Sequence, residues 1–235
     1  KNLIKKDIVN SFFPKDYENM TYVEPFVGGG AIFFYKRPSK KEVINDLDSK
    51  LISVYKGVKK YNPNDTEKLL NNNITKEEFD RLKASEPTTD HTKFIKNFIL
   101  YKTSFLAKGY NYNYSRHHPH VDIDCHHQRL KKVTILNKDY KKVIEKYDSP
   151  NTFFYLDPPY EGSTGSHYTH SSFNIEELYD ILKNIKGKFL VSFNMSKEAL
   201  QLFKDFKIYK INTKYSVGST GKKMTKKVEL LIKNY

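Results

Sequence analysis

Two periodicities alternate along this chain, and together they predict an α/β fold. Apolar residues at near-helical spacing predict helices over residues 2–13, 49–60, 66–71, 75 onward, 92–103, 140–147, 174–185 and 196–204, and a further helix is expected directly after the glycines at 28–30. Short apolar runs bounded by polar residues predict strands near 22–27, 42–45, 132–137, 153–156, 189–192, 208–212 and 228–232. This alternation is typical of a doubly wound sheet, and the last two strands predict a C-terminal antiparallel hairpin.

The stretch from residue 61 to 131 departs from this alternation. It opens with a turn cluster and continues with helical patterns, one of which begins with a capping-box signature at Thr75 and Glu78. No segment in it resembles a strand of the main sheet. We therefore predict one domain from residues 1–60 and 132–235, and a mainly helical inserted subdomain over 61–131.

The most informative strand is 153–156, because it ends in Asp157, Pro158, Pro159 and Tyr160. Parallel sheets bind ligands just outside the carboxyl ends of their strands. Two prolines fix the backbone and remove two donors, which leaves a rigid surface of acceptors. Such a surface suits an amino group: the carboxylate and the first proline carbonyl accept its hydrogens while the tyrosine stacks on its ring. The alternative is an ordinary strand followed by a proline-stiffened loop.

Two other strand ends carry candidate binding groups. The glycines at 28–30 let the backbone approach a ligand closely, although their spacing matches neither a dinucleotide fingerprint nor a P-loop. Asp46 ends the second strand 18 residues after the first glycine, where an acid binds a ribose in dinucleotide folds, whereas Asp48 is expected to cap the following helix. Asp139 either accepts a hydrogen bond from an adenine amine or caps the helix that follows it.

The charge balance points to a polyanionic partner. The net charge is +14 and the pI is about 9.5, and two long runs contain no acid. The first run covers residues 91–121, and the second, 206–228, carries seven lysines. No amphipathic or long apolar segment accompanies these runs, so nucleic acid is favoured over a membrane. The alternative is surface charge that serves solubility.

Tyrosines and asparagines alternate within the first acid-free run. Such side chains offer flat stacking surfaces and amides for base edges, while neighbouring cations reach phosphates. The alternative is a tyrosine-rich surface strand or loop. The residues predicted to bind DNA, including two from the second run, are Lys102, Lys108, Tyr110, Asn111, Tyr112, Asn113, Tyr114, Arg116, Lys222 and Lys223.

Cysteine and histidine usage bounds the remaining chemistry. The single cysteine, Cys125, excludes an intrachain disulfide framework and fits a reducing compartment. Five histidines surround it within residues 117–127, but without zinc-binding spacing, so we predict no metal and a mobile polar loop. No signal peptide or membrane span is visible, which favours a cytoplasmic protein, and the basic runs favour one that associates with nucleic acid. The chain opens at Lys1 without a methionine, and we expect further N-terminal sequence before it.

The order of these motifs resembles the Dam-type, D12 class of DNA adenine-N6 methyltransferases in their alpha arrangement. The segment from Glu24 to Gly30 resembles the family's first motif, which wraps S-adenosylmethionine, and 157–160 resembles its catalytic D-P-P-Y. The resemblance implies a Rossmann-like methyltransferase sheet with the insertion as target-recognition subdomain. It implies cofactor contacts from Glu24, Pro25, Phe26, Gly28, Gly29, Gly30, Asp46, Asp139, Tyr140 and Asp157, and catalysis by Asp157, Pro158, Pro159 and Tyr160.

We therefore predict a site-specific enzyme that methylates N6 of an adenine flipped out of double-stranded DNA, working as a monomer or weak dimer, as in restriction-modification. One rival is a methyltransferase of RNA or protein side chains, because the D-P-P-Y motif reports the amine and not the polymer. Another is a non-catalytic DNA-binding protein on a methyltransferase scaffold. A nicotinamide oxidoreductase is disfavoured by the missing fingerprint. The family's Gly-Gly-Lys opening would fall at or before Lys1, and the insertion has no clear recognition hairpin, so the recognised sequence is not implied.

Overall fold

The computed structural model describes residues 4–64, 67, 73–104, 109–114, 121–159, 173–215 and 225–235. The chain divides into two compact units. The first consists of Lys1–Asp46 and Lys138–Tyr235, and the second is Leu47–Asn137. The second unit contains the whole of the predicted insertion and extends beyond it at both ends.

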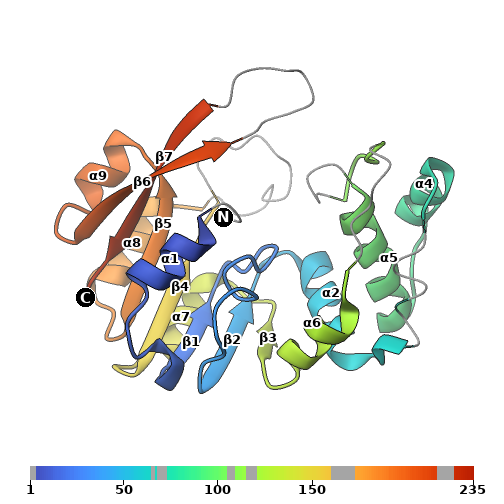
Figure 1. The fold of residues 1–235 in the computed structure, drawn as a ribbon, viewed down its shortest axis with the longest axis horizontal. Helices are drawn as coiled ribbons and strands as arrows, with labels where there is room; N and C mark the ends of the chain where they lie inside the picture. The colour runs from blue at the N-terminus through green and yellow to red at the C-terminus, as the bar shows by residue number, and fades with distance from the viewer. Residues whose placement is uncertain are drawn as a thin grey trace. The chain divides into compact units, whose positions relative to one another are not determined.

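The sheet has the order β3-β2-β1-β4-β5-β7-β6 (Figure 1). Its strands are β1 (Thr21–Glu24), β2 (Lys41–Asn45), β3 (Thr134–Leu136), β4 (Thr152–Leu156), β5 (Lys188–Asn194), β6 (Lys207–Tyr215) and β7 (Thr225–Lys233). Strands β2, β1, β4 and β5 run parallel, whereas β7 is antiparallel to both β5 and β6. This is a doubly wound order with its last strand inserted antiparallel, so the predicted α/β sheet and C-terminal hairpin are confirmed.

Burial explains why the central strands read as continuous apolar runs. Every residue of β4 is buried, and Phe153 packs edge-on against Phe13 with ring centroids 4.7 Å apart. A strand covered on both faces needs apolar residues at successive positions, which is the pattern that predicted it. The helices of this unit are α1 (Lys5–Phe12), the 3₁₀ turn η1 (Tyr17–Asn19), α7 (Tyr140–Tyr147), α8 (Ile175–Lys183) and α9 (Lys197–Leu202).

The second unit is mainly helical. Its described helices are α2 (Ser49–Lys60), α4 (Lys76–Ala84), α5 (Asp90–Thr103) and α6 (Ile123–Leu130). The predicted capping box at the start of α4 is present, because Thr75 and Glu78 bond reciprocally. Helices α2 and α5 pack closely at Gly57, where a side-chain carbon would lie 2.1 Å from the ring of Phe94.

Two secondary-structure predictions are wrong. The segment after the glycines forms hydrogen-bonded turns and no regular helix, since Gly28 and Gly30 adopt positive φ and only single i to i−4 bonds follow, such as Phe34 N–H to the Gly30 carbonyl. The histidine-rich stretch 117–127 was expected to be a mobile loop, but residues 123–130 form α6, which Asp122 caps by accepting from the Cys125 amide. Residues 117–120 lie outside the described residues. The glycines and hydroxyl side chains between residues 161 and 172 predict a mobile loop. That stretch and nearly all of the predicted helix at 66–71 lie outside the described residues.

No helix within the described ranges is long and apolar enough to span a bilayer.

Candidate active site

The glycine turn and the acid after β2 meet at the carboxyl edge of the sheet. Because β1 and β2 are parallel, their ends lie together, and the Gly28 amide donates to Asp46 Oδ2 over 2.9 Å. A side-chain carbon added at Gly28 or Gly29 would meet no atom within 4 Å, so open space faces this backbone. Asp48, and not Asp46, caps α2. The prediction that Asp48 caps this helix is therefore confirmed, and the ribose-binding role of Asp46 stays a prediction.

A cavity of about 270 Å³ joins the ends of β1, β2 and β4. It brings together residues that are far apart in sequence, which is what a ligand site at this edge requires. Six of the predicted site residues line it: Glu24, Phe26, Gly28, Gly29, Asp46 and Asp157. Its volume is close to the lower end of small-molecule sites, roughly 300–1,000 Å³.

The cavity wall is acidic and partly buried. Glu24 is 2% exposed and accepts a 2.5 Å hydrogen bond from the Tyr22 hydroxyl. Burial raises the pKa of Glu24 to about 8; the Tyr22 bond and the Lys36 charge oppose this rise, and the Asp157 charge adds to it. Burial, with Asp157 next in importance, also holds the pKa of Tyr155 well above its usual value. Carboxyl groups that are buried next to one another resist ionisation, and a positively charged ligand in the cavity would relieve the repulsion between their charges. The cavity wall therefore favours a ligand that carries positive charge.

The raised pKa of Glu24 predicts a pH-dependent stability. An acid whose pKa is higher in the folded state than in the unfolded chain stabilises the fold when protonated, so its contribution is full below about pH 4.5 and is lost as pH rises through about 8. Between pH 5.5 and 8.5 we expect the free energy of unfolding to fall by a few kcal/mol, at about 1.4 kcal/mol per pKa unit. The Glu24→Gln variant should show a flatter profile in urea unfolding, whereas Glu198→Gln, on an exposed residue of α9, should keep the wild-type slope. Equal slopes for all three proteins would contradict the assignment.

The predicted Asp139 and Tyr140 pair divides into two roles. Asp139 caps α7 by accepting from the Lys141 amide over 2.8 Å, so the helix-cap alternative holds. The Tyr140 ring lies 5.0 Å from that of Phe26, which lines the cavity, and both rings are about 6.1 Å from Phe173. The Tyr140 hydroxyl is buried without a hydrogen-bond partner among the described residues, and burial raises its pKa to about 12. Phe173 was not predicted, because a lone aromatic before a helix cap carries no signal.

The remaining members of the predicted sites lie around the cavity or outside the described chain. Pro25 is buried and its carbonyl accepts from the Asn45 side chain over 2.9 Å, while the Gly30 amide closes the turn onto the Val27 carbonyl. Pro158 is buried directly after Asp157, and Pro159 is partly exposed. Tyr160 lies outside the described residues.

The tyrosine and asparagine run of the second unit is only partly free for a ligand. Tyr112 packs its ring 5.6 Å from that of Phe79 and donates its hydroxyl to the Ile74 carbonyl, so it serves the unit's own packing. Tyr114, in contrast, is 72% exposed, and Asn111 is also exposed.

The other predicted DNA contacts divide in the same way. The backbone of Asn113 donates to the Thr103 carbonyl, and that of Tyr110 accepts from Lys83. Burial lowers the pKa of Lys102 at the end of α5. The predicted contacts Lys108, Arg116, Lys222 and Lys223 lie outside the described residues.

Within the described residues, no three His, Cys, Asp or Glu side chains are grouped to hold a metal ion. Two histidines of α6 are instead engaged with backbone carbonyls: His126 Nδ1 lies 2.5 Å from that of Asp122, and His127 Nδ1 lies 2.8 Å from that of Val58.

The motif order around this cavity matches a known family over most of the chain. The model of the D12 class N6 adenine-specific DNA methyltransferases matches residues 1–217. The chain belongs to this family. As a D12 methyltransferase it is an enzyme of DNA adenine methylation, which confirms the resemblance read from the motifs.

This D12 methyltransferase matches curated relatives over nearly the whole length of both chains. It is 28% identical to the type II methyltransferase M1.LlaDCHI of Lactococcus lactis subsp. cremoris, over 97% of this chain and 90% of the relative. It is 29% identical to the type II methyltransferase M.MjaIII of Methanocaldococcus jannaschii, over 91% of this chain and 88% of the relative. Among solved structures, the precorrin-6y C5,15-methyltransferase of Geobacter metallireducens GS-15 aligns with 100% of this chain and 87% of its own, at 8% identity and a TM-score of 0.44.

Proposed function

We propose that this D12 methyltransferase transfers the methyl group of S-adenosylmethionine to N6 of an adenine rotated out of double-stranded DNA, at a specific sequence. The observation that carries the proposal is the single cavity that combines Glu24, the glycine turn and Asp46 with Asp157. Direct methyl transfer requires that the site for the methyl donor adjoins the residues that hold the adenine amine, here called the acceptor grip. The ends of parallel strands supply that geometry.

The residues of the cavity fit the methyl donor. The open space before Gly28 and Gly29 admits a ligand against the backbone, and the acidic wall at Glu24 and Asp157 suits a cation. Phe26, backed by Tyr140, offers a flat surface for an adenine ring. Asp46 lies where a ribose hydroxyl pair is bound in related folds. When bound, S-adenosylmethionine supplies a methyl group that its sulfonium has already activated.

The acceptor grip is assigned to the segment after β4. The Asp157 carboxylate and the Pro158 carbonyl would each accept one hydrogen of the adenine amine, while Pro159 stiffens the segment and Tyr160 stacks on the purine. This arrangement directs the N6 lone pair toward the donor. The amine proton becomes acidic only after N6 takes the methyl group, so no strong base is required beforehand. Positioning and electrostatics would then supply most of the rate.

DNA binding is assigned to the predicted insertion and the basic runs. Exposed Tyr114 and Asn111 could stack on and bond to bases, and the lysines of the acid-free runs would neutralise phosphates. Residues 61–131 thus act as the target-recognition subdomain in this proposal. Extrusion of the base into the cavity gives the acceptor grip access to N6.

The proposal is tested with methyl-labelled S-adenosylmethionine and three acceptors: duplex DNA of mixed sequence, duplex RNA of the same sequence, and lysine- and asparagine-containing peptides. We expect label in the DNA alone, recovered as N6-methyldeoxyadenosine after digestion to nucleosides, and confined to one sequence context. Label in RNA or peptide at a comparable rate would redirect the assignment to another polymer. Failure to bind the donor would indicate a non-catalytic protein on this scaffold.

A further inference from the structure

A buried lysine follows the glycine turn in sequence, and it was not among the predicted site residues. Among the described residues, Lys36 is the one lysine or arginine that is buried, and its side chain has no exposed area. Lysine is almost never fully buried unless it is paired. Its position therefore has to be explained by its partners.

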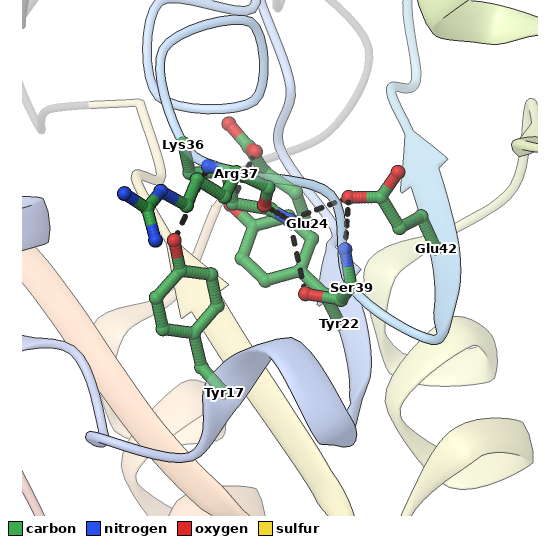
Figure 2. Close-up of polar contacts among 7 residues, drawn as sticks. All are labelled: Tyr17, Tyr22, Glu24, Lys36, Arg37, Ser39 and Glu42. Carbon is green, nitrogen blue, oxygen red and sulfur yellow. Dashed lines mark hydrogen bonds and ion pairs between the residues drawn. The ribbon is translucent and has the colours of Figure 1, made fainter.

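Polar groups hold Lys36 Nζ on one side. The ammonium donates to Glu42 Oε1 at 2.5 Å, to Ser39 Oγ at 3.1 Å and to the Arg37 carbonyl at 3.0 Å. Glu42 is 5% exposed and also accepts from the Ser39 amide, so its carboxylate is fixed. Figure 2 shows these contacts converging on the lysine.

On another side, the same ammonium contacts the ring of Tyr22, whose hydroxyl bonds a residue that lines the cavity. Lys36 Nζ lies 4.0 Å from the centroid of the Tyr22 ring, and the Tyr22 hydroxyl donates to Glu24 (Figure 2). A cation over the face of a phenol ring withdraws electron density from the ring, and this makes the hydroxyl a stronger hydrogen-bond donor. Through the Tyr22 hydroxyl, the lysine charge therefore stabilises the ionised form of Glu24, a carboxyl group that lines the cavity.

We infer that Lys36 is a positioning residue for methyl-donor binding: seated between Glu42 and the Tyr22 ring, it strengthens the Tyr22 hydrogen bond, and so orients the Glu24 carboxyl group and favours its ionisation when the cationic donor binds. This inference rests on the proposed function, because it names the group that prepares the donor site. Lys36 does not touch the donor. It acts through Tyr22 and through its own charge.

The groups that face Glu24 determine whether its carboxyl group is ionised. Its own strand contributes Tyr22, the segment after β1 contributes Lys36, β2 contributes Glu42, and the end of β4 contributes Asp157. The Tyr22 bond and the Lys36 charge favour the ionised form, whereas burial and the two other acids oppose it, and burial is the largest of these effects. In the free protein at neutral pH, Glu24 is therefore mostly protonated.

Donor binding should then release a proton. A cation in the cavity favours the Glu24 carboxylate, so the carboxyl proton passes to the solvent when the donor binds. Affinity for S-adenosylmethionine should rise with pH, by up to about tenfold per unit, and level off near the pKa of about 8 that Glu24 has in the free protein. Without Lys36 or the Tyr22 hydroxyl, the levelling point should move to higher pH.

The test measures S-adenosylmethionine binding by titration calorimetry from pH 6 to 9, in two buffers of different ionisation enthalpy to count released protons. Tyr22→Phe keeps the ring and removes the hydroxyl. The pair Lys36→Met with Glu42→Gln removes both charges together, so that neither is left buried alone. For Tyr22→Phe we expect about three- to tenfold weaker binding at pH 7 and a levelling point moved up by about one unit. The double variant should shift both in the same direction by a smaller amount, because the loss of the Glu42 charge offsets part of the loss of the Lys36 charge. Glu24→Gln should release no proton.

A matched control separates positioning from folding. Val23 lies between Tyr22 and Glu24 on β1 and is fully buried, but its side chain points to the opposite face of the sheet. Val23→Ala should lower the melting temperature and leave the pH profile of binding unchanged. If Tyr22→Phe and the double variant behave like Val23→Ala, Lys36 has a structural role only and the inference is wrong. If the wild-type protein binds no donor, the proposed function fails instead.

Discussion

Replacing Asp157 by alanine should abolish methyl transfer, lowering kcat by roughly a thousandfold or more, while S-adenosylmethionine still binds. Asp157 lines the cavity and supplies one of the two acceptors assigned to the adenine amine. Loss of one preorganised hydrogen-bonding group in a transition state lowers rates by about 10²–10³, and here the lost group also carries charge. Donor binding should survive, because removal of the Asp157 charge lowers the pKa of Glu24 and favours its ionised form.

The measurement is single-turnover transfer of labelled methyl to duplex DNA, with donor affinity measured separately by calorimetry. Asp180→Ala is the matched control, since it removes an exposed aspartate of α8 and should leave kcat unchanged. Transfer by Asp157→Ala at more than a tenth of the wild-type rate would show that the amine is held by other groups. A loss of donor binding as large as the loss of transfer would make Asp157 a cofactor ligand first.

The second large effect is expected from Gly57→Ala in α2. Helix propensity alone predicts that this change stabilises the protein by about 1 kcal/mol. The structure predicts the opposite, because the new carbon would lie 2.1 Å from Phe94 Cγ and 2.7 Å from Phe94 Cβ. Phe94 is 1% exposed and stacks on Tyr61, and its Cβ cannot move without the backbone of α5. We expect net destabilisation of roughly 2 kcal/mol or more.

Chemical unfolding followed by circular dichroism measures this effect. Lys56→Ala, on the exposed neighbour of Gly57, should change the free energy of unfolding by less than about 0.5 kcal/mol. Combining Gly57→Ala with Phe94→Leu should restore part of the lost stability, since the smaller side chain makes room. A Gly57→Ala protein at least as stable as the wild type would mean that α2 and α5 do not pack as described.

The regular elements were predictable because their signals are local. The fully buried β4 appears in sequence as an unbroken apolar run, and the start of α4 as a capping box at Thr75. The helix expected after Gly30 was wrong, since a strand followed by glycines and apolar residues does not reveal that Gly28 and Gly30 adopt positive φ. Helix α6 was missed because its histidine-rich sequence is polar on most sides and its capping residue, Asp122, was not recognised as a helix start.

The candidate site was predictable to a similar extent. Asp46 and Asp157 each follow a predicted strand, and parallel strands deliver their ends to one edge, so their convergence could be expected. Asp139 was ambiguous between a ligand contact and a cap, and only the hydrogen bond to the Lys141 amide shows the cap. Phe173 reaches the ring of Phe26 through the fold alone.

By itself, the sequence determined the α/β alternation, the order of the motifs and the family, because these depend on residue type and on spacing along the chain. The tertiary structure alone decided which charged groups are removed from water. Neither the burial of Lys36 and Glu42 nor the raised pKa of Glu24 can be read from a motif. Solvation and charge pairing depend on neighbours that β1, β2 and β4 bring together across more than a hundred residues, and the chemistry of the site follows from those neighbours.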